Sequence, residues 1–366
     1  MIIENGLVFQ EDGTYKKETI YIENHKIVSS YDEVSDKTVI DATGLKVIPG
    51  LIDVHSHGAF GHDFSDADVE GLKTILKYEK SHGITSYCPT SMTLGIDMLK
   101  DIFGTAHQVE KNPEFANIVG LNMEGPFLDP EKKGAHLSEY IVHLSSEFFD
   151  YCQDASHGMI KLVTVAPNSQ GAMEFIEEKH NEVAISLGHT SANYECCMEA
   201  FQKGASQVTH LYNAMPAFTH RAPGLVGAAF DHKDCFVELI SDGIHVHPSV
   251  VRSTFQMFPD RVVLISDSMM ATGMENGTYE LGGQEVTVTD GKATLKNGTI
   301  AGSATNLYDC MRRAISFGIT EKEAIFAATK HPAKCIGIYE QVGSISVGKE
   351  ADLLLVTEDF ELKQVI

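Results

Sequence analysis

Short apolar runs alternate with segments of helical spacing through the middle of this chain. Over residues 68–81, apolar side chains recur every three or four residues, as at Val69, Leu72 and Ile75, which predicts a helix with one buried face. The same spacing predicts further helices over Ser91–Val109, Glu147–Ala155, Gln170–Lys179, Ala192–Lys203 and Pro248–Phe258.

Between these helices lie eight short apolar runs that are typical of buried strands. Most of them are followed by Gly, Pro, Ser or Thr. The runs are Leu51–His57, Ile84–Pro89, Ile118–Glu124, Lys161–Ala166, Val183–Gly188, Gln207–His210, Val237–Asp242 and Val262–Asp267. Eight strands alternating with helices predict an α/β fold of the (β/α)8 TIM-like barrel type over residues 50–337. A doubly wound sheet is the alternative, but no Gly-x-Gly-x-x-Gly follows any of the strands.

The two ends of the chain have a different pattern. Residues 1–49 alternate apolar and polar positions around tight turns such as Asn5-Gly6 and Asp12-Gly13, and residues 338–366 have the same character. We therefore expect both termini to pair into one small β-sandwich domain. A hairpin over 278–300 and two closing helices, Asn306–Phe317 and Glu321–Lys330, are expected after the last barrel strand.

Polar residues follow the predicted strands at the points where the strands end. Because the carboxyl ends of barrel strands meet at one rim, we expect these side chains to lie close together. Each alone is compatible with a capping role, but six at matching positions indicate a functional site. They are His55, His57, Glu124, His189, His210 and Asp267.

Imidazole and carboxylate groups in this arrangement suit one or two divalent cations, Zn²⁺ or Fe²⁺. A bound metal lowers the pKa of water from about 16 towards about 7, which provides hydroxide at neutral pH. Asp267 is the natural acid–base residue for a hydrolase of this kind. Strand four ends in Val165-Ala166-Pro167 and offers no lysine to bridge two ions, so Glu124 is the candidate central carboxylate.

The formal net charge of −23 argues against nucleic acid or an anionic membrane as a partner. An anionic small substrate would need a local cluster of Arg, Lys or His. No secretory signal or membrane span is apparent, and seven scattered cysteines do not form a disulfide framework. We expect a cytoplasmic location.

Several motifs resemble those of the N-acetylglucosamine-6-phosphate deacetylases of the amidohydrolase superfamily, and the likeness covers nearly the whole chain in unbroken order. The most specific are Glu-Gly-Pro-Phe (124–127) and His-Leu-Tyr-Asn-Ala-Met (210–215). The others are Pro-Gly-Leu-Ile-Asp-Val-His-Ser-His-Gly (49–58), Lys-Lys-Gly-Ala-His (132–136), Gly-His-Thr (188–190), Asp-Gly-Ile-His-Val (242–246), Ser-Asp-Ser (266–268) and Ile-Ala-Gly-Ser (300–303).

The resemblance implies hydrolysis of the acetamido group of N-acetylglucosamine 6-phosphate to glucosamine 6-phosphate and acetate, in amino-sugar catabolism. It implies that Glu124, His189 and His210 hold the main metal and that metal-bound hydroxide attacks the amide carbonyl, with Asp267 as general base and then acid. His136 would contact the substrate carbonyl or the sugar. Some members of the family lack the second histidine of the His55/His57 pair and use one metal, so the intact pair here makes a second ion plausible.

The resemblance also implies a substrate pocket and a homodimer. Arg221 and His245 are the expected phosphate partners, and the arginine would reach the neighbouring subunit's site. The lining residues would be Ala135, His136, Asn213, Ala214, Asp242, Gly243, Ile244, His245, Ile300, Ala301 and Gly302. Two alternatives stay open: an enzyme for N-acetylgalactosamine 6-phosphate, and a non-catalytic scaffold, which would have lost ligands that this chain retains.

Overall fold

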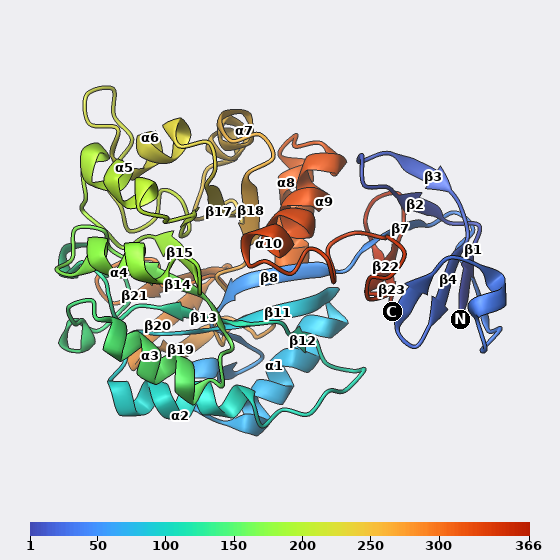
Figure 1. Cartoon of the computed structure of the whole chain (residues 1–366), viewed down its shortest axis with the longest axis horizontal. Helices are drawn as coiled ribbons and strands as arrows, with labels where there is room; N and C mark the ends of the chain where they lie inside the picture. The colour runs from blue at the N-terminus through green and yellow to red at the C-terminus, as the bar shows by residue number, and fades with distance from the viewer.

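The computed structural model describes all 366 residues, and its centre is a nearly closed barrel of eight parallel strands (Figure 1). The backbone N–H of Asp267 donates to the carbonyl of His55 at 2.9 Å and links the last barrel strand to the first. The prediction of a (β/α)8 barrel is confirmed. The strands are β8 (Leu51–Ser56), β11 (Ile84–Ser91), β13 (Leu121–Glu124), β14 (Ile160–Val165), β15 (Ala184–Leu187), β16 (Gln207–Val208), β17 (Phe236–Ile240) and β18 (Val262–Ile265).

Helices cover the outside of the barrel because each has an apolar face. In α1, the Asp68 side chain accepts a hydrogen bond from the backbone N–H of Glu70 and caps the helix, while Leu72, Ile75 and Leu76 are buried. The helices are α1 (Val69–Ser81), α2 (Ile96–Ala106), α3 (Ser146–Ala155), α4 (Ala172–Lys179), α5 (Tyr194–Gln202), α6 (Gly224–Asp231), α7 (Pro248–Met257), α8 (Leu307–Ser316), α9 (Glu321–Ala328) and α10 (Lys330–Cys335). None of them is long and apolar enough to cross a membrane.

Some boundaries differ from those predicted. The run 118–124 is divided into β12 (Asn117–Ile118) and β13, and α2 begins at Ile96 because β11 continues to Ser91. Helix α6 was not predicted. Six of its eight residues are buried and two are glycines, so it lacks the polar face that gives a surface helix its periodicity.

The ends of the chain form two sheets: the first contains only N-terminal strands, and the second combines strands from both termini. One has the order β5 (Lys26–Val28), β4 (Ile20–Glu23), β1 (Ile2–Glu4), β6 (Val39–Asp41), and the other β23 (Leu362–Val365), β22 (Leu353–Val356), β7 (Lys46–Pro49), β2 (Leu7–Phe9), β3 (Tyr15–Lys17). A cluster of buried apolar residues from these sheets is separate from the barrel core. We propose that residues 1–49 and 338–366 are one small domain.

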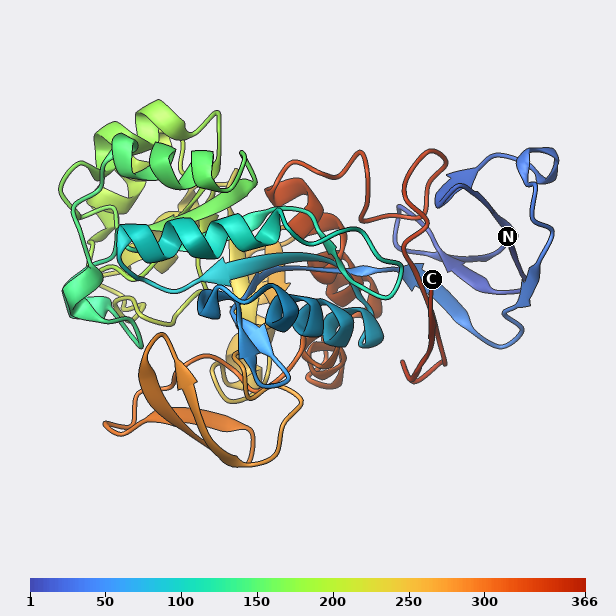
Figure 2. The same ribbon diagram turned by 90° about the horizontal axis from the view of Figure 1, so that it is seen from below.

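Only Gly50 separates β7 from β8, so the small sheets lie at the amino ends of the barrel strands (Figures 1 and 2). A side chain at Gly50 would collide with Thr85, which fixes the close approach at this junction. In place of the predicted hairpin, the chain forms a three-stranded sheet of β19 (Gly277–Leu281), β20 (Gln284–Thr289) and β21 (Lys292–Leu295), which projects from the barrel in Figure 2. Short pieces complete the chain: β9 (Gly58–Ala59), β10 (His62–Asp63) and four 3-10 turns at Tyr31–Glu33, Phe64–Asp66, Pro130–Lys132 and Ser138–Tyr140.

Candidate active site

Five imidazoles surround the carboxylate of Glu124, the last residue of β13. Oxygen Oε1 lies 3.1 Å from Nε2 of His210 and 3.2 Å from Nε2 of His189. Oxygen Oε2 lies 3.2 Å from Nε2 of His57 and 3.3 Å from Nε2 of His136. Nε2 of His55 is 3.3 Å from Oε1. All six side chains are buried, so residues far apart in the sequence meet at one rim of the barrel.

Asp267 completes this group from the end of β18. Its Oδ1 lies 3.4 Å from Nε2 of His57 and 3.6 Å from Nε2 of His55. Burial raises the pKa of Asp267, but the hydrogen bond from His57 and the neighbouring imidazoles offset it, and the pKa ends below its usual range. The carboxyl group is therefore ionised at neutral pH, as a proton acceptor must be.

The backbone is unusual at three of these positions. His189, His210 and Asp267 have φ values of 45°, 27° and 49°, in the left-handed region that few non-glycine residues adopt. Each lies just beyond a barrel strand, and the turn directs its side chain back over the rim. Strained backbone of this kind is concentrated at functional sites.

Hydrogen bonds on the outer ring nitrogens fix the tautomers of three histidines. A carbonyl oxygen can only accept, so Nδ1 of His57 donates to Thr90 at 3.1 Å and Nδ1 of His189 donates to Lys132 at 2.9 Å. Nδ1 of His55 is 2.9 Å from the carboxylate of Glu238. In their neutral forms, these three imidazoles therefore present an Nε2 lone pair to the Glu124 side.

His136 has the opposite arrangement. Its Nδ1 accepts a hydrogen bond from the backbone N–H of Thr93 at 3.1 Å, so in the neutral ring the proton is on Nε2. Burial lowers the pKa of His136 to about 4, which keeps the ring neutral at pH 7. Distance alone would group His136 with Glu124 and His189 as metal ligands. A protonated Nε2 cannot ligate a metal, and His136 is instead a hydrogen-bond donor.

The arrangement fits a divalent cation. Nε2 of His55 is a buried polar atom without a hydrogen-bond partner, although two carboxylates lie within 3.6 Å of it. No lysine or arginine pairs with Glu124 or Asp267. Burial lowers the pKa of His57, but Asp267 and Glu124 outweigh burial and raise the pKa to about 10. The buried carboxylates therefore favour a positive charge among the imidazoles. A divalent metal ion provides this charge and also binds the free Nε2 lone pairs.

A cavity of about 290 Å³ opens beside this cluster and has the size of a small-ligand site. Most of the predicted site residues line it, but neither a lysine nor an arginine does. The predicted residues on its wall are His57, Glu124, Ala135, His136, His189, His210, Asn213, Ala214, His245, Asp267, Ile300 and Gly302.

The remaining predicted residues are placed differently. His55 lies behind the cavity wall, and Asp242 supports His245 by accepting from its Nδ1 at 2.7 Å. Gly243, Ile244 and Ala301 lie in the predicted turns without facing the cavity. Arg221 is an exposed loop residue that does not line the cavity of its own chain.

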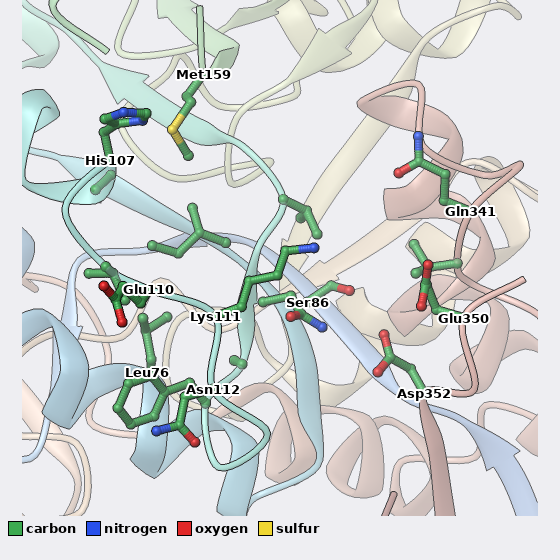
Figure 3. Close-up of a pocket in the computed structure, with 18 residues that line it drawn as sticks. Leu76, Ser86, His107, Glu110, Lys111, Asn112, Met159, Gln341, Glu350 and Asp352 are labelled. Atoms are coloured by element: carbon green, nitrogen blue, oxygen red, sulfur yellow. The ribbon is translucent and has the colours of Figure 1, made fainter. Parts of the chain in front are cut away.

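The structure contains a larger cavity, of about 420 Å³, that none of the predicted site residues line. Figure 3 shows Lys111 in its middle, with Glu350 and Asp352 across from it. It lies between the barrel and the small sheets, at the end of the barrel remote from Glu124. The smaller cavity is therefore the candidate active site, because the predicted metal ligands and proton carriers line it.

The sequence reasoning missed four residues of the cavity wall, Met92, Gly134, Leu281 and Thr299, and one charged residue behind it. Glu238 lies inside β17 rather than at the end of a strand, and it contacts both His55 and His210. A single charged residue in the apolar run Val237–Ile240 was the available signal.

Comparison with known proteins agrees with the geometry. Residues 46–366 match the model of the amidohydrolase family. An N-acetylglucosamine-6-phosphate deacetylase from Bacillus subtilis (strain 168) is 35% identical over 368 residues, which cover 99% of this chain and 91% of the relative. An N-acetylgalactosamine-6-phosphate deacetylase from Escherichia coli O157:H7 is 32% identical over 87% of this chain and 85% of its own length. The crystal structure of the N-acetylglucosamine-6-phosphate deacetylase from Pasteurella multocida superposes with a TM-score of 0.92 at 30% identity, covering 100% of this chain and 97% of that one.

Proposed function

This chain belongs to the amidohydrolase family and is a hydrolase, and we propose that it converts N-acetylglucosamine 6-phosphate to glucosamine 6-phosphate and acetate in amino-sugar catabolism. The observation that carries the proposal is the buried Glu124 carboxylate with imidazole Nε2 atoms around it and Asp267 beside it. Relatives that match over nearly the whole chain have this activity in their names.

The family is metal-dependent, and we infer that Glu124, His189 and His210 hold the main divalent cation. His55 and His57 would hold a second one with the same carboxylate. Zinc and iron are the metals that this mixture of ligands suits best. When bound, the cation acidifies a water molecule and polarises the amide carbonyl.

Asp267 and His136 supply the proton chemistry of the proposed reaction. The Asp267 carboxylate accepts a proton from water as the new C–O bond forms, and it returns that proton to the amide nitrogen as the C–N bond breaks. His136 donates its Nε2 proton in a hydrogen bond to the carbonyl oxygen, where negative charge develops. Both groups line the same cavity.

The phosphate of the substrate needs cationic partners, and the cavity of one chain provides only histidine. Asp242 accepts hydrogen bonds from the ring and the backbone N–H of His245 and fixes that ring at the cavity. We infer that the second partner is Arg221 of another subunit in a homodimer, because this arginine is exposed and does not line its own cavity. A guanidinium group matches phosphate well.

The remaining cavity wall would hold the sugar ring. Ala135, Asn213, Ala214, Ile300 and Gly302 surround the space between the metal ligands and His245. Seven free cysteines suit a reducing compartment, and we propose the cytoplasm.

Turnover on the two epimeric sugar phosphates tests this function. Release of acetate from N-acetylglucosamine 6-phosphate is expected to have the higher kcat/KM. The relative from Escherichia coli O157:H7 makes N-acetylgalactosamine 6-phosphate the alternative substrate, and a higher kcat/KM for it would replace the proposed one. The Asp267→Asn variant is the control for contaminating activity.

A further inference from the structure

We propose that Glu238 is a positioning residue for the metal centre, acting through His55 and His210 together. This inference rests on the proposed metal-dependent function but concerns a residue to which that function assigns no role. Glu238 lies in β17 (Phe236–Ile240), and its side chain is completely buried.

A single oxygen of Glu238 contacts both histidines. Its Oε2 accepts from Nδ1 of His55 at 2.9 Å and from the backbone N–H of His210 at 3.0 Å. Its Oε1 accepts from the side-chain amide of Gln207, and its backbone carbonyl accepts from Leu211 at 2.8 Å. A buried carboxylate among apolar neighbours is costly unless it is fully hydrogen-bonded, and three donors meet that requirement here.

The contact with His55 decides whether this histidine can bind a metal. With its proton on Nδ1, His55 presents a lone pair at Nε2, which has no other partner and lies 3.3 Å from Oε1 of Glu124. The opposite tautomer would place a proton on Nε2 and donate it to Glu124, and His55 would no longer be a ligand. The carboxylate of Glu238 therefore selects the ligating form.

The contact with His210 acts on the backbone instead of the ring. His210 has a φ of 27°, and the hydrogen bond from its backbone N–H to Glu238 stabilises this strained turn. The turn brings Nε2 of His210 to 3.1 Å from Oε1 of Glu124. Two of the three histidines near Oε1 of Glu124, His55 and His210, are thus both held from behind by one oxygen of Glu238.

The Glu238→Gln variant tests this inference through zinc binding to chelator-treated protein, measured by calorimetry. We expect zinc affinity to fall about 10- to 100-fold, which is typical when the partner of a ligating histidine is removed. Glu79→Gln is the matched control, because Glu79 is equally buried but its carboxyl group contacts none of the site histidines. The zinc affinity of this variant should equal that of the wild type. Equal affinities for all three proteins would overturn the inference.

A double-mutant cycle distinguishes positioning from general destabilisation. In a His55→Ala background, the Glu238→Gln substitution should reduce zinc affinity clearly less than it does in the wild type, because one of its two targets is gone. A reduction of the same size in both backgrounds would contradict action through His55.

A measurement on the unaltered protein covers the case in which Glu238→Gln fails to fold. Nitrogen-15 NMR of the histidine side chains in the zinc-loaded wild type should show His55 protonated at Nδ1 and not at Nε2. Protonation at Nε2 would overturn the inference. A wild type that binds zinc but deacetylates neither sugar would contradict the proposed function and leave the role of Glu238 intact.

Discussion

His57 and His136 place their Nε2 atoms at nearly equal distances from the same oxygen of Glu124, 3.2 and 3.3 Å, yet they have opposite tautomers. His57 donates from Nδ1 to the carbonyl of Thr90, whereas His136 accepts at Nδ1 from the N–H of Thr93. One ring therefore presents a lone pair and the other a proton. We propose that this difference assigns metal binding to His57 and stabilisation of the substrate's carbonyl oxygen to His136.

The tautomer difference predicts opposite outcomes for two alanine substitutions. His136→Ala should keep its metal and lose kcat by about 10²- to 10³-fold, the usual effect of removing one donor to an oxyanion. His57→Ala should lose metal content. Metal analysis and steady-state kinetics of the two purified variants test this, and loss of metal from His136→Ala would refute the assignment.

Asp267→Asn should abolish proton transfer without emptying the metal site. The amide cannot accept a proton from water, so kcat should fall by about 10²- to 10⁴-fold while metal content stays near that of the wild type. His210→Ala, in contrast, should lose metal and activity together because its Nε2 lies 3.1 Å from Glu124. Near-normal turnover by Asp267→Asn would remove this residue from its role.

Arg221→Ala should raise KM for the phosphorylated sugar about 10- to 100-fold, because the phosphate loses one charge-assisted hydrogen bond. Metal content should not fall. Co-expression with Asp267→Asn tests whether the arginine comes from the neighbouring subunit. In a mixed dimer, the site with an intact Asp267 receives an intact Arg221, so roughly a quarter of the wild-type activity should return at low substrate concentration. Without any recovery, the arginine does not act across an interface.

The pH dependence of stability should differ between the metal-free and the zinc-loaded protein. The pKa of His57 is about 10 in the folded metal-free chain and about 6.5 in an unfolded one. Protonation of His57 therefore stabilises the metal-free fold fully below pH 6.5, and this contribution, on the order of a few kcal/mol, is lost as the pH rises towards 10. Zinc displaces the proton and removes the effect.

Thermal midpoints between pH 7 and pH 10 give the comparison. The midpoint of the chelated protein should fall with pH more steeply than that of the zinc-loaded protein, and His57→Gln should reduce the slope of the chelated form. Parallel curves for the chelated and loaded proteins would contradict the electrostatic account of the site.

Much of the site followed from the sequence because parallel barrel strands end at one rim. Glu124 and Asp267 are encoded on different strands, but the alternation of strands and helices is enough to bring them together. The tautomer of His136 could not be predicted, since it depends on a backbone N–H from a different loop. Glu238 was missed because it lies inside a strand and acts from behind the ligands.

The barrel fold was also predictable from the sequence, but some of its elements were not, because their sequences carry no clear pattern. The apolar helix α6 has no polar face to produce a periodic pattern, and β16 is only two residues long, so its end depends on pairing with β15 and β17. The meeting of the two termini was expected from their shared pattern. Their pairing through β7 and β22 required tertiary structure to define its register.

We propose that the Glu124 cluster binds the cation on which deacetylation by this barrel depends. Acetate release from N-acetylglucosamine 6-phosphate, measured before chelation, after it, and after re-addition of stoichiometric zinc or iron(II), tests this dependence. We predict that activity disappears with the metal and returns with it. A protein that rebinds the metal at this site and still releases no acetate, or one that keeps full activity without metal, would contradict the account.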